Sequence, residues 1–146
     1  MISIIPFKIL SLDEEGFHLM VKMYINRKSA NLIIDTGASK TVLDKTRAEK
    51  YVLNKNFALH NKLSSGLGTN TMESQTTILK RIRLGEIEIE NYTTILLDLS
   101  HVNHSYEQLG LGAVDGVLGS DILLKYNALI DYEKKILKLK YKKRRK

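Results

Sequence analysis

The sequence contains no cysteine, so the chain can form neither disulfides nor thiolate metal sites. It also lacks long hydrophobic runs: its apolar stretches span only a few residues, far fewer than the roughly 20 that a membrane-spanning helix needs. No leader-like segment develops after Met1, because an acidic run at 13–15 interrupts the N-terminal region. These absences predict a protein without a membrane span, and we expect it in the cytoplasm.

The length of 146 residues is that of a single domain large enough to bury a hydrophobic core. Hydrophobic residues make up 43% of the chain and charged residues 27%, as in ordinary globular proteins. The sequence shows no internal repeat and no low-complexity linker. We therefore expect one domain over residues 1–139 and a basic tail at 140–146.

The net charge of +7 comes from the C-terminal end of the chain. Nine of the 23 basic residues lie between Lys134 and Lys146, where no acidic residue occurs. The rest of the chain keeps 14 basic residues against 16 acidic ones, a balance of −2. A terminal block of like charge is usually a solvated end. Contact of this tail with nucleic acid or with a membrane surface is the alternative interpretation.

Alternating apolar and polar residues predict a series of short strands. These strands are expected at 17–25, 30–34, 76–84, 86–90, 94–99, 128–131 and 136–139. The basic residues of 81–84 and the acidic residues of 86–90 are placed for cross-strand pairing around Gly85. Helices are predicted only from Asp44 to Tyr51, with Asp44 as N-cap, and from Ser120 to Tyr126. The fold class is mostly β, closed or barrel-like, with one or two short helices.

The residues with chemical potential follow the strand at 30–34, where Asp35 comes directly after three apolar residues. A carboxylate at the end of a buried strand is costly unless it accepts hydrogen bonds. Thr36 and Gly37 offer a hydroxyl and unobstructed backbone N–H groups around a tight turn. A plain Asp-Thr-Gly turn that only joins two strands is the alternative, and the triplet needs support from other motifs.

That support comes from a resemblance that covers residues 17 to 140. Asp35-Thr36-Gly37-Ala38-Ser39, between an apolar strand and Thr41-Val42-Leu43, resembles the active-site segment of retropepsin-like aspartic proteases. Residues 63–70 are similar to the flap of that family, residues 115–123 to its second signature, and residues 130–137 to its closing hairpin. Leu-Gly-Ser-Asp at 118–121 departs from the retroviral enzymes, so the chain resembles cellular and bacterial single-lobe members.

The resemblance implies a closed retropepsin-like β-barrel with a flap hairpin. It also implies an aspartic endopeptidase that hydrolyses polypeptides, with Asp35, Thr36 and Gly37 as the catalytic residues. The flap residues Gly66, Leu67 and Gly68 would close over an extended peptide. This mechanism needs two carboxylates that share a proton around one water, and it needs no cofactor and no metal.

The chain has only one Asp-Thr-Gly triplet. Asp115 and Asp121 are candidates for an internal second carboxylate, but their positions fit a turn and a helix-start cap instead. A second copy of Asp35 must then come from a second chain, across the two-fold axis of a homodimer. The alternative is a catalytically silent retropepsin-like domain that binds peptides or only dimerises.

Other constellations give weaker signals. The Gly66-x-Gly68 stretch lacks the third glycine of a dinucleotide-binding loop. His101 and His104 are three residues apart in a predicted polar loop, with no accompanying thiolate, so we expect no metal there. Ser39 lacks the second glycine of a nucleophile elbow, where Thr41 stands instead. The sequence therefore favours peptide hydrolysis by aspartate over these chemistries.

Overall fold

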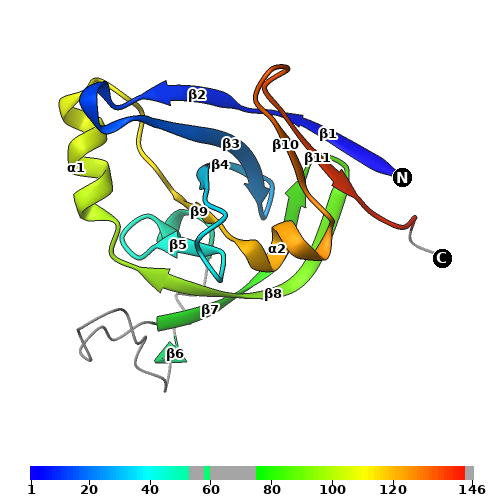
Figure 1. Cartoon of the computed structure of the whole chain (residues 1–146). Coiled ribbons are helices and arrows are strands. Elements are labelled where there is room, and N and C mark those ends of the chain that lie inside the picture. Colours follow the sequence, from blue (N-terminus) through cyan, green and yellow to red (C-terminus); the bar gives the residue numbers. More distant parts are fainter. Residues whose placement is uncertain (53–57, 60–74, 144–146) are drawn as a thin grey trace.

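The computed structural model describes residues 1–52, 58–59 and 75–143 and shows a closed β-barrel (Figure 1). Within these residues six strands form a ring, since β7 pairs both with β8 and with β3. In ring order they are β3 (Phe17–Ile25), β4 (Lys28–Ile34), β9 (Gly116–Leu118), β5 (Val42–Asp44), β8 (Ile87–Leu97) and β7 (Gln75–Leu84). Two short strands extend this sheet, β2 (Lys8–Ser11) beside β3 and β6 (Ala58–Leu59) beside β7. The mostly β, barrel-like prediction is confirmed.

A second, three-stranded sheet brings the two ends of the chain together. It has the order β1 (Ile2–Pro6), β11 (Ile136–Lys140) and β10 (Leu129–Asp131), all antiparallel. The N-terminal ammonium donates a hydrogen bond to the Tyr141 carbonyl at 2.8 Å. The predicted hairpin of β10 and β11 is confirmed. Neither β1 nor β2 was predicted, because their short runs show little alternation in the sequence.

The long hairpin of β7 and β8 pairs the basic arm with the acidic arm. Arg81 lies opposite Glu90 and Arg83 opposite Glu88, as expected for the basic and acidic arms. The prediction of separate strands at 86–90 and 94–99 is wrong, because β8 runs without a break from Ile87 to Leu97. Asn91 has a positive φ of 54°, and its polar neighbourhood hides the continuity of the strand in the sequence.

The predicted helix from Asp44 to Tyr51 is wrong. Asp44 ends β5, and only one 3-10 turn follows, η2 (Ala48–Lys50). The Asp44 carboxylate is buried and accepts hydrogen bonds from the Leu99 N–H at 3.0 Å and from the Thr46 hydroxyl at 2.7 Å. Asp44 therefore ties this segment to the residue just before the Ser100–Gln108 helix, whereas the sequence predicted that it capped a helix of its own.

Two α-helices are present in the described part of the chain, α1 (Ser100–Gln108) and α2 (Ser120–Lys125). The helix predicted from residue 120 is confirmed as α2. The predicted polar loop around His101 and His104 is wrong, because both residues lie in α1. Val102 and Tyr106 lie four residues apart in α1 and both pack against the cluster under the helix, so the sequence did carry apolar residues at helical spacing, between polar ones. Neither helix is long and apolar enough to cross a membrane.

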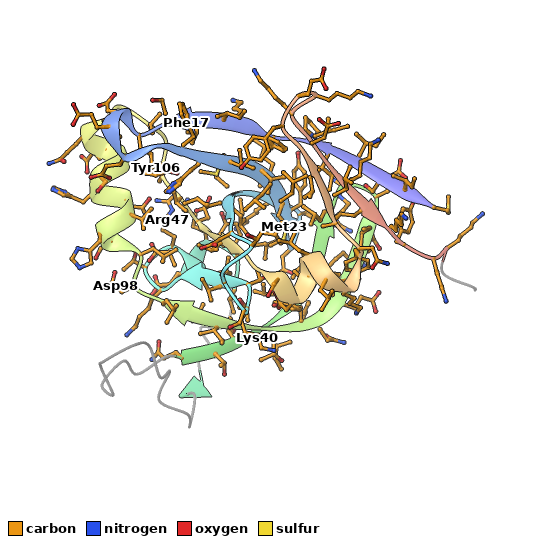
Figure 2. The ribbon with its side chains drawn as sticks, viewed as in Figure 1. Phe17, Met23, Lys40, Arg47, Asp98 and Tyr106 are labelled. Carbon is orange, nitrogen blue, oxygen red and sulfur yellow. The ribbon has the colours of Figure 1, made fainter. Side chains whose placement is uncertain are left out.

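The core fills the barrel and continues to the inner face of the three-stranded sheet. Met23 lies inside the barrel (Figure 2), and Ile25, Leu32 and Leu118 are fully buried with it. A smaller cluster of Leu12, Ile33, Tyr106 and Val114 lies under α1. The strands around residue 35 are thus anchored on both faces.

Tyr106 allows a prediction about alkaline pH. Burial raises the pKa of Tyr106 from 10.0 to about 12, and its hydroxyl lies 2.7 Å from His18 Nδ1. A raised folded-state pKa contributes stability that is present below pH 10 and is lost as the pH rises towards 12. Subtracting the tyrosinate absorbance of Tyr106→Phe from that of wild type isolates the ionisation of Tyr106. We expect this difference to show no ionisation near pH 10 while the protein is folded. A step at pH 10 in native protein would contradict the burial argument.

Candidate active site

Asp35 is exposed and directly follows β4, which ends at the buried residue Ile34. Its backbone N–H donates to the Leu118 carbonyl at 3.0 Å, and its carbonyl accepts the Ala38 N–H at 3.2 Å. The Gly37 N–H donates to Asp35 Oδ1 at 2.9 Å. The backbone of the following turn therefore orients the carboxylate while the side chain stays open to solvent.

Gly37 has a steric reason to be glycine as well. A Cβ at this position would lie 3.3 Å from Asp35 Oδ1, which is closer than nine in ten such contacts, so the carboxylate would have to shift. Thr36 and Gly37 are both exposed beside Asp35. The structure thus brings the three predicted residues together on one exposed turn.

The second predicted signature lies next to this turn. β9 pairs in parallel with β4, so that Ile34 lies opposite Leu118, and β9 leads directly into α2. The Ser120 N–H donates to the Ala38 carbonyl at 2.7 Å. Gly119 packs so closely that a Cβ there would lie 2.6 Å from the Lys40 carbonyl carbon. Lys40 lies beside α2 in Figure 2.

Asp115 and Asp121 both have partners within the fold. Asp115 is buried, accepts the Asn31 N–H at 2.9 Å and forms an ion pair with Arg47 Nε at 2.7 Å. The predicted capping role of Asp121 is wrong: the N-cap of α2 is Gly119, with no side-chain cap. Both carboxylates hold loops at the ends of the barrel strands, which leaves Asp35 as the exposed carboxylate of the site.

Sequence reasoning missed the cluster of Thr41, Tyr92 and Asp121. Asp121 Oδ1 accepts two hydrogen bonds from Thr41, from N–H at 2.9 Å and from Oγ1 at 2.8 Å, and Oδ2 accepts one from the Tyr92 hydroxyl. Burial and, secondarily, the hydrogen bond to Asp121 raise the pKa of Tyr92, so the hydroxyl stays protonated. The three polar residues come from three separate segments, so no local sequence pattern indicates that they form a cluster. The sequence singled out only Asp121, because of its position at the start of a helix.

Other predicted features lie elsewhere. The flap residues Gly66, Leu67 and Gly68 lie outside the described residues. His104 on α1 lies 3.2 Å from Gln108 Nε2, and no group of three potential metal ligands occurs in the described part of the chain. Among the described residues, the predicted site presents one exposed carboxylate per chain, oriented by the backbone of its turn.

Three solved structures have a fold similar to that of this chain. A retropepsin-like aspartic protease from Rickettsia conorii matches with a TM-score of 0.58 at 21% identity, over 97% of this chain and 94% of that one. The retroviral protease-like domain of Ddi1 from Leishmania major gives 0.56 at 18% identity, over 84% and 87%. The EIAV protease in complex with the inhibitor HBY-793 gives 0.54 at 19% identity, over 80% and 93%. At these identities the matches establish the fold.

A family model supplies the stronger evidence. The model described as aspartyl protease matches residues 21–122, from β3 through the Asp35 turn to the start of α2. No curated protein matches the chain. Since the matched segment covers more than half of the sequence and carries both signatures, the chain belongs to the aspartyl protease family.

Proposed function

We propose that the protein is an aspartic endopeptidase whose active site forms between two copies of the chain, each contributing Asp35. The observation that carries the proposal is the exposed Asp35 carboxylate, held by the Gly37 N–H at 2.9 Å. The chain contains one such triplet, and Asp115 and Asp121 are engaged elsewhere. A two-fold dimer is the simplest arrangement that places two equivalent carboxylates together.

The mechanism follows from the proximity of the two carboxylates. Two such groups around one water cannot both ionise, so one stays protonated while the other is charged. The charged carboxylate takes a proton from the water as it attacks the peptide carbonyl carbon, and the protonated one donates to the carbonyl oxygen. Protonation titrates as a property of the pair.

The other predicted residues have supporting roles in this proposal. Thr36 is exposed next to Asp35 and would brace the pair across the axis, while Gly37 lets the turn approach closely. Gly66, Leu67 and Gly68 would cover an extended polypeptide substrate. Backbone pairing with the substrate would supply affinity, and side-chain pockets would supply selectivity.

The proposal is tested by cleavage of an unfolded protein between about pH 4 and pH 8, because the protonation of the carboxylate pair sets the pH dependence of the rate. Wild type is assayed over a dilution series, with Asp35→Asn as the matched control and the mass in solution measured on the same samples. We expect activity that rises faster than linearly with protein concentration. A folded, dimeric and inert wild type would overturn the proposal and favour the silent peptide-binding domain.

Position 38 gives a prediction about pH dependence. Ala38 has no hydroxyl to donate to the carboxylate pair, so the ionised form lacks one stabilising hydrogen bond. We therefore expect wild type to work best at mildly acidic to near-neutral pH. Ala38→Ser adds a donor that favours the ionised form, so its pH optimum should move downward. Ser39→Ala, which removes a hydroxyl from the neighbouring exposed position, is the control, and an unmoved optimum in Ala38→Ser would contradict the prediction.

A further inference from the structure

The segment from Asp35 to Thr41 is held at several points along its length. At its start, the Asp35 N–H bonds to β9 through the Leu118 carbonyl. In its middle, the Ala38 carbonyl accepts the Ser120 N–H at the beginning of α2. At its end, Thr41 is buried, with 1% of its surface exposed. At this end of the segment, side chains as well as backbone groups hold the chain in place.

Thr41 is the centre of this restraint. Its N–H and hydroxyl both donate to Asp121 Oδ1, at 2.9 and 2.8 Å. The same hydroxyl accepts the Gly119 N–H at 3.0 Å, and the Thr41 carbonyl accepts the Thr94 hydroxyl at 3.3 Å. Thr41 thereby joins the active-site segment to β8 and to the start of α2.

Asp121 is fixed in turn by Tyr92. The Tyr92 hydroxyl donates to Asp121 Oδ2, so that both carboxylate oxygens are engaged. Hydrogen bonds to a charged acceptor are stronger than those between neutral groups. Tyr92 lies on β8, and β5, which directly follows Thr41, lies between β8 and β9. The carboxylate therefore bridges α2, the active-site segment and β8.

We propose that Asp121 and Tyr92 are positioning residues that hold the Asp35 turn in its catalytic geometry through Thr41. The proposal rests on the proposed peptidase function, and it assigns no contact of either residue with substrate. Two carboxylates must meet around one water, so a displacement of one turn by a fraction of an ångström in each chain misaligns both. Loss of the restraint should slow the chemical step.

The fold has other anchors besides the contact between Asp121 and Tyr92, so we expect variants of these two residues to fold. α2 is also anchored by its buried residues Ile122 and Leu123, and β8 by its pairing with β7 and β5. Tyr92→Phe keeps the ring and removes only the hydroxyl. Asp121→Asn keeps an oxygen acceptor for Thr41 and removes the charge that the Tyr92 hydroxyl faces.

The experiment compares kcat, KM and thermal stability of Tyr92→Phe and Asp121→Asn with wild type. We expect kcat to fall about 10- to 100-fold in each, with KM within about twofold, because a positioning role changes the geometry of the chemical step and not the binding of the peptide. Tyr24→Phe and Asp13→Asn, which change exposed residues elsewhere, should leave kcat unchanged. Combining the two site variants should cost little more than either alone, because they remove one interaction.

A second readout makes the result independent of activity. Amide hydrogen exchange of Thr41 and Gly119 should be faster in both site variants than in wild type, since their N–H groups lie within the network. An active wild type whose variants keep kcat within twofold would overturn the positioning role. An inert wild type would overturn the peptidase proposal itself, and unchanged protection of Thr41 and Gly119 would then overturn the network as a restraint on the turn.

Discussion

The Asp35→Asn protein is expected to fold and dimerise like wild type but to cleave unfolded protein roughly a thousandfold more slowly or not at all. The amide keeps an oxygen that can accept the Gly37 N–H, so the turn retains its 2.9 Å hydrogen bond. It cannot ionise, and the pair loses the group that takes the proton from water. The cleavage rate measures the chemical step. Circular dichroism and the mass in solution, measured on the same samples, show whether the variant folds and dimerises.

Mixing the two proteins extends the same prediction to the dimer. If each active site needs one Asp35 from each chain, adding an equal amount of Asp35→Asn to wild type, at a concentration where the mass in solution shows full dimerisation, should lower the wild-type activity to about half, because mixed dimers form. Equal activity of wild type and Asp35→Asn would identify either a contaminating peptidase or a different catalytic residue. Activity unaffected by mixing would argue that each chain works alone.

Gly116→Ala should have the largest effect on stability. Gly116 lies in β9, between β4 and β5, and a Cβ there would collide with the Val42 carbonyl oxygen and lie 3.0 Å from Leu43 Cδ2. Backbone of a central barrel strand must move to make room, which costs about 3 kcal/mol. For a chain of this length the melting temperature should fall by roughly 10 °C, as measured by calorimetry or thermal circular dichroism.

Gly112→Ala is the matched control. A Cβ at Gly112 would meet no atom within 4 Å, so its melting temperature should stay within a few degrees of wild type. If both variants melt like wild type, the close packing of β9 against β5 is wrong. Since β9 also supports the Asp35 N–H, Gly116→Ala should lose activity at temperatures where Gly112→Ala retains it.

The strands that the sequence predicts well are those with clean local alternation. β3 alternates over Phe17–Ile25 because one face meets the barrel core, and the register of Arg81 with Glu90 follows from a short turn at Gly85. Where the pattern is not local, prediction failed. α1 is a different case: Val102 and Tyr106 lie four residues apart and pack on the cluster under the helix, but the polar residues around them led to the prediction of a loop. β1 finds its partner, β11, only at the other end of the chain.

The sequence by itself determined the chemistry of the candidate site: an Asp, a Thr and a Gly at the end of an apolar strand, followed by a second Gly-containing signature before a short helix. Local order and residue type suffice for this, because adjacent residues in a tight turn share one environment. The tertiary structure alone decided what surrounds that turn. The bonds of Asp121 to Thr41 and Tyr92, and of Asp115 to Arg47, join residues that lie between 29 and 80 positions apart. Such pairs form only when the barrel closes, so no local pattern in the chain encodes them.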